Sequence, residues 1–273
     1  MIELPEVYVL AEDMNRELRG KKIKLAEADH SPHAFALYTG NPAEYNGKLA
    51  GKTITGADIY SGSVRLRAED MLLILTTPVR FHKKGEKLPE KHQLYIGFED
   101  DTSITCTVQM WGSMFCFREG DTDGVPRQHI INDIPSPLEE GFHEAFYKAM
   151  LQKEKLTSLS AKAFLTTDQR IPGLGNGVAQ DILFTAKIHP KRKMSALSDT
   201  ELKALFEAAK GVLADMRQRG GRDTEYDFYG NRGGYKTILS KNTVNKPCPI
   251  CNTLIKKESF LGGSIYFCEN CQK

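Results

Sequence analysis

Residues 248–271 read CPICNTLIKKESFLGGSIYFCENC, and this stretch specifies how the carboxyl end of the chain folds. It contains two Cys-x-x-Cys pairs separated by sixteen residues. Each pair presents two thiolates from one tight turn, which is what tetrahedral zinc ligation needs. The alternating segment between the pairs predicts a β-hairpin that turns at Gly262 and Gly263. We therefore predict a structural zinc site whose ligands are Cys248, Cys251, Cys268 and Cys271.

Two other interpretations of these cysteines are disulfide bonds and four unrelated thiols. Disulfides are rare in cytosolic proteins, and unrelated thiols would have no reason to occur as two matched pairs. The hairpin offers few apolar residues for a core, so the metal is expected to drive its folding; zinc-finger peptides gain roughly 10 kcal/mol or more from zinc. Cys106 and Cys116 lie in strand-like apolar sequence and are predicted to be ordinary core residues.

Composition places the chain among soluble globular proteins, with 273 residues of which 40% are hydrophobic and 26% charged. The amino terminus lacks the basic start and apolar run of a secretory signal. The longest aliphatic run, residues 71–75, is far shorter than the roughly 20 residues that a membrane span needs. We therefore expect a cytoplasmic protein that does not enter membranes.

Charge is unevenly distributed although the net value is only +2. From Thr185 to the end, 16 Lys and Arg residues stand against 9 Asp and Glu residues. A basic carboxyl-terminal third favours a polyanionic partner. An ordinary solvated surface would show the same excess.

The rest of the chain divides into an amino-terminal helix, a β-rich region and a helical region. Residues 4–18 repeat apolar side chains on one helical face, with Pro5 in the first turn and Gly20 after the end. Short β-rich pieces separated by Gly, Asp and Pro fill residues 22–119, as in a sandwich or barrel. Helical sequence follows from 138 to 219. We predict an α+β multidomain fold with boundaries at 1–125, 136–230 and 238–273.

Two loops carry candidate binding chemistry. Gly173-Leu-Gly175-Asn176 precedes a good helical sequence, and such a loop leaves backbone N–H groups uncovered at a helix N-terminus, where a phosphate fits. A plain turn with an Asn cap is the alternative. Farther on, FYGNRGGYKTIL at 228–239 mixes Gly, aromatic and basic residues, which suits either a nucleic-acid backbone or an ordinary surface connection.

At the amino terminus, ELPEV at residues 3–7 sets two carboxylates, Glu3 and Glu6, on either side of Pro5 and close to the terminal amine. This cluster is either the start of an ordinary helix or the edge of an active site. Its position beside a potential amine nucleophile makes it a candidate catalytic group.

Together these pieces resemble the formamidopyrimidine-DNA glycosylase/endonuclease VIII family over essentially the full length. Four motifs carry the resemblance, all in the family's order: ELPEV at 3–7, GLGN at 173–176, ILFTAKIHPKR at 182–192 and the cysteine finger at 248–271. The resemblance implies an N-terminal helix with an antiparallel β-sandwich, a helix–two-turn–helix domain and a C-terminal zinc-finger hairpin. It also implies a monomer that works on damaged DNA in the nucleoid.

The function that the resemblance implies is base-excision repair. A damaged base is flipped out of the duplex and its N-glycosidic bond is cut. In the family the terminal amine, normally a proline, attacks the sugar C1′, and β,δ-elimination then cuts the strand. Glu3 matches the catalytic Glu that handles protons, and Glu6 matches the second carboxylate. The matches to the phosphate-binding motif are Gly173, Gly175 and Asn176, and the four finger cysteines match the zinc ligands.

The chain departs from the family where the proline should be, because Ile2 stands there. If Met1 stays, as the bulky second residue predicts, the free amine moves by roughly 3.5 Å. A displacement of that order costs about 100-fold or more in rate. If Met1 is removed, Ile2 offers a hindered primary amine. We therefore predict that AP-lyase activity is reduced or absent.

Three further departures leave the catalytic function open. Ser63 stands where the family has a lysine in its first β-hairpin, with Arg65 and Arg67 as candidate substitutes. Near the tip of the finger, Lys256 and Lys257 replace an Arg, and they lack its bidentate fork. The family's Arg-Phe wedge falls at Met110 and Trp111, which are apolar wedges of suitable size unless the Trp is a core residue.

The second hypothesis is therefore a non-catalytic protein that binds lesions or DNA structures on the same fold. The missing Pro, Lys and Arg favour this hypothesis. Glu3 and Glu6 favour the enzyme, because carboxylates repel phosphate and a protein that only binds DNA has no need of them there. Lesion selectivity is expected to reside around Val178, Asp181 and residues 222–237.

Overall fold

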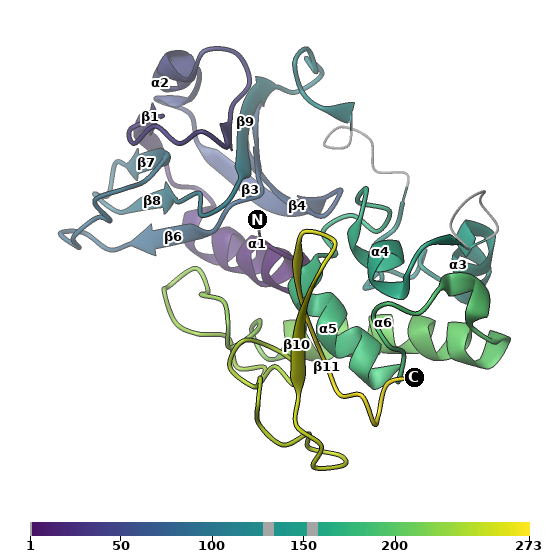
Figure 1. Cartoon of the computed structure of the whole chain (residues 1–273). Coiled ribbons are helices and arrows are strands. Elements are labelled where there is room, and N and C mark those ends of the chain that lie inside the picture. The colour runs from purple at the N-terminus through teal and green to yellow at the C-terminus, as the bar shows by residue number, and fades with distance from the viewer. Residues whose placement is uncertain (1, 128–133, 152–157) are drawn as a thin grey trace. The chain divides into compact units, whose positions relative to one another are not determined.

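A computed structural model describes residues 2–127, 134–151 and 158–273 (Figure 1). These residues form two compact units. The first takes the described residues of 1–2, 6–132 and 225–233, and the second takes those of 3–5, 133–224 and 234–273. Helix α1 (Leu4–Leu18) has the bounds that its apolar repeat predicts, and Gly20 follows it with a φ of 86°.

The first unit contains two sheets. The four-stranded sheet has the order β1 (Ile23–Ala28), β7 (Leu94–Phe98), β8 (Ser103–Cys106), β6 (Val79–His82). The five-stranded sheet has the order β2 (Ala36–Leu37), β9 (Gly112–Arg118), β5 (Met71–Leu75), β4 (Ser63–Ala68), β3 (Ile54–Tyr60). Every described pair is antiparallel except β2 with β9. A short turn of helix, η1 (Pro42–Glu44), leads into α2 (Tyr45–Leu49).

Alternation of side chains along the strands explains why the two sheets share one core. A single apolar cluster takes residues from both sheets and from α1. Strand β5 is buried on both faces. Leu73 and Leu75 enter the shared core, while Leu72 and Ile74 join a second cluster with Val125. Cys106 and Cys116 are fully buried, as predicted. Strand β8 ends at Cys106 and a loop follows it, so strands cover less of residues 22–119 than the β-rich sequence predicts.

The second unit is helical and ends in the hairpin. Its helices are α3 (Glu144–Leu151), α4 (Ala161–Thr166), α5 (Asn176–Thr185) and α6 (Asp199–Gln218), with a short turn η4 (Met194–Ala196). Ser198 and Glu201 form a capping box at the start of α6, which explains why the longest helix begins there. Among the described helices, none combines the length and the apolar character that crossing a membrane would demand.

The hairpin of β10 (Lys256–Phe260) and β11 (Gly263–Phe267) turns one residue earlier than predicted. Leu261 and Gly262 occupy the turn, with φ of 52° and 71°, and Gly263 already pairs with Phe260. Two-residue hairpin turns of type I′ need positive φ at both central residues. The turn therefore accepts a strained leucine at its first position.

Candidate active site and metal centre

The Glu3 carboxylate is seated on the N-terminus of α5. The backbone N–H of Gly177 donates to Oε1 at 2.9 Å, and that of Val178 donates to Oε2 at 2.8 Å. The first N–H groups of a helix have no acceptor within the helix and carry the positive end of its dipole. Glu3 supplies that acceptor from 174 residues away in sequence. A side chain predicted to be catalytic is thus held in one orientation.

The glycines of the 173–177 loop provide the space for this contact. A Cβ at Gly175 would lie 2.6 Å from Cδ of Glu3, and a Cβ at Gly177 would lie 3.0 Å from Oε1. Gly173 has a φ of 76°, and its carbonyl accepts from the Leu4 N–H at 2.8 Å. The loop therefore receives Glu3 by its side chain and Leu4 by its backbone. Glycine is required at 175 and 177 because a Cβ there would clash with the Glu3 side chain, and it is favoured at 173 because of the positive φ.

Arg222 lies beside Glu3, and the sequence does not predict this contact. Its Nη1 lies 3.4 Å from Oε2 of Glu3, and the side chains are 4% and 15% exposed. The Gly220-Gly221-Arg222 sequence carries no local pattern that points to an acid 219 residues away. The sequence predicts Arg222 to be the first residue of a selectivity segment, and the structure shows it paired with the predicted catalytic Glu.

Asp181 is fully buried and bonded to the backbone. Its two oxygens accept from the Leu239 N–H at 2.8 Å and the Ile238 N–H at 2.9 Å. Burial raises the pKa of Asp181 to about 6, against the opposing effect of these hydrogen bonds and of the Arg222 charge. Val178 is also fully buried. Both side chains are interior groups, and Asp181 holds the 238–239 backbone, which lies just after the 222–237 segment whose shape is expected to set lesion selectivity.

Ile2 lies in the apolar core of the first unit, 8% exposed. Its backbone N–H donates to the Thr76 carbonyl at 3.0 Å. Glu6 is buried in the first turn of α1. Met1 was predicted to carry the alternative amine, and it lies outside the described residues.

Asn176 is the first residue of α5, and it joins the helix to the hairpin. Its Nδ2 donates to the Ser264 carbonyl at 3.0 Å, and its Oδ1 is buried without a hydrogen-bond partner. Gln180 on the same helix donates to that carbonyl at 3.2 Å and accepts from the Tyr266 N–H at 3.0 Å. From α4, Lys162 donates to the Phe260 carbonyl at 2.5 Å. These side chains tie the finger to α4 and α5.

The basic residues proposed as substitutes are engaged with acids. Arg65 makes a bidentate contact with Asp58 at 2.8 and 2.7 Å, and its guanidinium lies 4.1 Å from the Tyr60 ring centroid. Arg67 bonds Asp58 at 3.4 Å and Glu119 at 2.9 Å. Burial alone would raise the pKa of Asp58, but the hydrogen bonds and charge of Arg65 bring it below its ordinary value.

The other candidates differ in exposure. Ser63, at the family's lysine position, is 2% exposed at the start of β4. Lys256 and Lys257 are exposed on β10, and Lys256 pairs with Glu269. Met110 and Trp111 are 75% and 39% exposed, ahead of β9. The Trp is therefore not a core residue, and both side chains are available to a partner.

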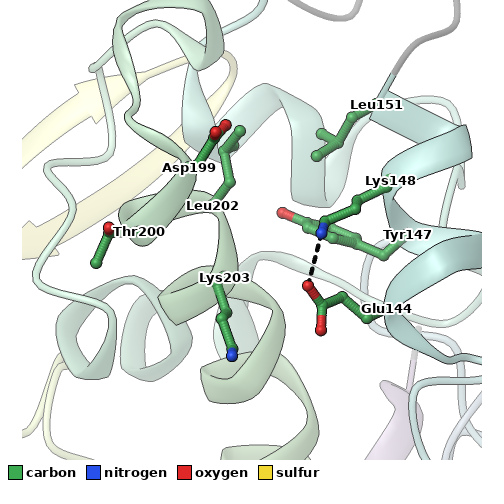
Figure 2. A pocket seen from close by; sticks show the side chains of 8 residues that line it. All are labelled: Glu144, Tyr147, Lys148, Leu151, Asp199, Thr200, Leu202 and Lys203. Atoms are coloured by element: carbon green, nitrogen blue, oxygen red, sulfur yellow. Dashed lines mark ion pairs between the residues drawn. The ribbon is translucent and has the colours of Figure 1, made fainter.

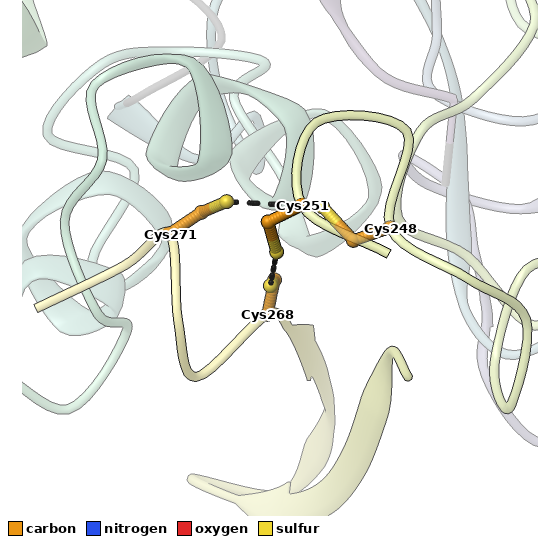
Figure 3. Close-up of side chains that lie close together, drawn as sticks. All are labelled: Cys248, Cys251, Cys268 and Cys271. Carbon is orange, nitrogen blue, oxygen red and sulfur yellow. Dashed lines mark hydrogen bonds between the residues drawn. The ribbon is translucent and has the colours of Figure 1, made fainter. Parts of the chain in front are cut away.

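The four finger cysteines point toward one another (Figure 3). Their sulfur atoms all lie within 4.8 Å, with Cys248 to Cys271 at 3.8 Å and Cys251 to Cys268 at 3.4 Å. A tetrahedron with metal–sulfur bonds of ≈ 2.3 Å has edges of about 3.8 Å. None of the four forms a disulfide bond. The geometry fits a four-thiolate metal site.

A separate pocket of 570 Å³ lies between α3 and α6 (Figure 2). Its lining is Glu144, Tyr147, Lys148, Leu151, Asp199, Thr200, Leu202 and Lys203. Two of these lining residues, Glu144 and Lys148, form an ion pair at 2.8 Å. None of the described residues predicted for the site belongs to this pocket.

Comparison with known proteins gives consistent matches. Residues 134–226 match the family model described as the formamidopyrimidine-DNA glycosylase H2TH domain. The formamidopyrimidine-DNA glycosylase of Mycoplasma genitalium is 30% identical over 199 residues, which covers 71% of this chain and 67% of the relative. The formamidopyrimidine-DNA glycosylase of Listeria monocytogenes is 28% identical over 291 aligned residues, and the alignment covers 100% of each chain. A solved Lactococcus lactis Fpg, in complex with DNA containing N7-benzyl-Fapy-dG, is 25% identical with a TM-score of 0.82 and covers 99% of each chain.

Proposed function

The chain belongs to the formamidopyrimidine-DNA glycosylase family, and from that membership we propose that it is a base-excision repair DNA glycosylase. It binds damaged DNA, flips out a lesion base and cuts its N-glycosidic bond. Its AP-lyase activity is reduced or absent, because Ile2 stands where the family has its amine nucleophile. The names of the relatives and the lesion-containing DNA of the Lactococcus lactis complex support the substrate class.

The observation that carries this proposal is the position of the Glu3 carboxylate on the N–H groups of Gly177 and Val178 at the start of α5, which we call the seat of Glu3. Cutting the C1′–N bond leaves the electron pair on the base and positive charge on the sugar. A fixed carboxylate stabilises that charge without having to reorganise during the reaction. Water then forms the new C1′–O bond and Glu3 takes a proton from that water. The departing base nitrogen takes a proton from solvent, and Glu3 afterwards returns its own proton to solvent. Two helix N–H groups hold Glu3, which supports this role.

The environment of Ile2 supports weak lyase activity. With Met1 retained, the Ile2 nitrogen is a peptide amide, which is not a nucleophile and donates to the Thr76 carbonyl. With Met1 removed, the amine still sits in that hydrogen bond, and its side chain is packed in the core. With Met1 removed, an attack on C1′ therefore requires the Ile2 amine to leave these contacts.

The second candidate, a non-catalytic binding protein, is favoured by Arg65 and Arg67. Both are engaged with Asp58, so neither is a ready replacement for the family's lysine. Such a protein would keep the wedge of Met110 and Trp111 and the finger without the chemistry.

The α5 N-terminus is also the proposed phosphate site. Glu3 occupies the N–H groups of Gly177 and Val178. The donors proposed for a phosphate oxygen are therefore the backbone N–H of Asn176 and the second hydrogen of its side-chain amide, whose first is donated to the Ser264 carbonyl; Asn176→Ala removes the amide and keeps the backbone N–H. We expect Asn176→Ala to weaken binding to all sequences and to make the dependence on salt shallower, because phosphate contacts carry no sequence information. Unchanged affinity and slope would contradict the assignment.

Zinc is the proposed metal of the four-thiolate site, since Cys₄ sites of this geometry are characteristic of structural zinc. We also propose three parts, 1–125, 136–230 and 238–273, in a monomer that acts on nucleoid DNA in the cytoplasm. Size-exclusion chromatography with light scattering would test the monomer.

The deciding experiment measures base release from duplex and single-stranded DNAs that carry oxidised purines, oxidised pyrimidines or alkylated bases. Hot alkali after each incubation reveals base loss without lyase activity, and Glu3→Gln is the control. Release that disappears in Glu3→Gln establishes the glycosylase, and omitting the alkali reports strand cleavage. Tight binding with no release from any substrate would contradict the enzyme and favour the binding protein.

A further inference from the structure

Arg222 is a buried guanidinium beside the carboxylate on which the proposed reaction depends. Its side chain is 4% exposed and its Nη1 lies 3.4 Å from Oε2 of Glu3. An isolated bridge with Tyr235 holds the Arg222 backbone in place. A buried charge of this kind is costly unless other groups compensate it. Glu3 and Asp181 are two carboxylates of the second unit that compensate this charge.

The absence of a side chain at Gly177 leaves room for the Arg222 guanidinium. A Cβ there would lie 1.8 Å from Nη1 of Arg222, closer than any real contact. It would also lie 3.0 Å from Oε1 of Glu3. Any side chain at 177 would therefore displace the guanidinium first and the carboxylate second. The loop accommodates the ion pair, and a helix cap by Glu3 alone would not need that much room.

Counting acceptor positions shows what the ion pair does to Glu3. A carboxylate has about four lone-pair directions. The N–H of Gly177 takes one on Oε1 and the N–H of Val178 takes one on Oε2, while the Arg222 guanidinium lies 3.4 Å from Oε2 as an ion pair. Each oxygen keeps one direction outside these hydrogen bonds; on Oε2 the Arg222 cation competes for it, and on Oε1 it is available to water or a sugar. We propose that Arg222 is a positioning residue that fixes Oε2 so that the remaining face of the Glu3 carboxylate meets the reacting sugar.

This inference rests on the proposed function of Glu3, so its test uses binding as well as turnover. Two duplexes are compared, one with a neutral tetrahydrofuran abasic analogue and one with a cationic pyrrolidine analogue. A positioned carboxylate binds the cationic sugar more tightly, because it resembles the charge that develops during bond cleavage. The ratio of the two Kd values reports positioning whether or not the protein releases bases.

We expect the wild type to prefer the cationic duplex by about 10-fold or more, and Glu3→Gln to lose that preference. Arg222→Gln should lower it by about 5-fold while changing the affinity for the neutral duplex by less than about 3-fold. The Glu3→Gln/Arg222→Gln double variant should match Glu3→Gln alone, because the second change then has nothing left to position. Arg219→Gln, an exposed arginine nearby, is the matched control.

The sign of the change separates positioning from simple charge. Removing a positive charge beside a cationic ligand strengthens binding if Arg222 acts only by its charge, so a raised preference would overturn the proposal. An unchanged preference, or equal losses on both duplexes with a lowered Tm, would also overturn it. If Arg222→Gln does not fold, Gly177→Ala displaces the same guanidinium and should lower the preference similarly. Base release by the wild type, measured alongside, decides the proposed function separately.

Discussion

The cysteine finger and the seat of Glu3 are two sites in the same unit that are built in opposite ways. The finger takes its four cysteines from two short segments that a hairpin brings together, and all four lie within 24 residues. The seat of Glu3 joins the third residue of the chain to Gly177, Val178 and Arg222. A site built from local spacing is visible in sequence, whereas one built from distant segments appears only when the chain is folded.

The two sites also depend on different interactions. The finger has few buried apolar residues, so we propose that it depends on a bound metal for its fold. The seat of Glu3 relies on hydrogen bonds, a buried ion pair and glycines that make room for them. The following predictions test this difference, beginning with the largest effect.

Removing one finger ligand should have the largest effect. Cys268→Ser should abolish stoichiometric zinc and unfold the hairpin, because binding of structural zinc supplies about 10 kcal/mol or more. Elemental analysis of the purified chain measures the metal, and we expect about one zinc in the wild type. Cys106→Ala, at a fully buried cysteine outside the finger, is the control and should keep the metal. A Cys268→Ser chain that still held one zinc would show that these cysteines are not the ligands.

Crowding the seat of Glu3 should affect the reaction more than the fold. Gly175→Ala places a Cβ 2.6 Å from Cδ of Glu3, so the carboxylate must shift by a few tenths of an ångström or more. We expect base release in single-turnover experiments to fall by about 100-fold. Gly211→Ala on α6, where a Cβ meets nothing within 4 Å, should leave the rate unchanged and raise stability by about 0.5–1 kcal/mol. Equal rates in the two variants would mean that Glu3 tolerates displacement.

These two sites show how far the sequence predicts the molecule. The bounds of α1, the strands β3 to β5 and the cysteine cluster follow from periodicity, turn residues and spacing, all of which are local. The position of the hairpin turn at Leu261 and Gly262 could not be predicted, because leucine disfavours the positive φ that Leu261 adopts there. The pairing of Arg222 with Glu3 could not be predicted either. The engagement of Arg65 and Arg67 by Asp58 was likewise invisible, since it depends on the register of β3 against β4.

Asp181 offers a pH test of the buried network. Burial raises its folded pKa to about 6 from an ordinary value of 3.8, so the folded protein holds this proton more tightly than the unfolded chain. Its contribution to stability is therefore fully present below about pH 4 and is lost as the pH rises through about 6. The free energy of unfolding of the wild type, relative to Asp181→Asn, should fall by about 2–3 kcal/mol between pH 4 and pH 7. Chemical denaturation at several pH values measures it, and a constant difference would contradict a raised pKa.

The smallest effect is expected at the hairpin turn, where local sequence and structure disagree. Leu261 adopts a φ of 52° and is 54% exposed, so it bears left-handed strain without contributing to a core. Asn tolerates this conformation, and Asn-Gly is the preferred type I′ pair. Leu261→Asn should therefore stabilise the full chain by about 0.5–1 kcal/mol, seen as a rise in Tm of about 2–3 °C. Gly262→Ala, where φ is 71° and a Cβ meets nothing within 4 Å, should lower Tm by a similar amount. If Leu261→Asn instead lowered Tm, the leucine would have to make a contact that outweighs its strain, and the finger would depend on more than spacing and metal.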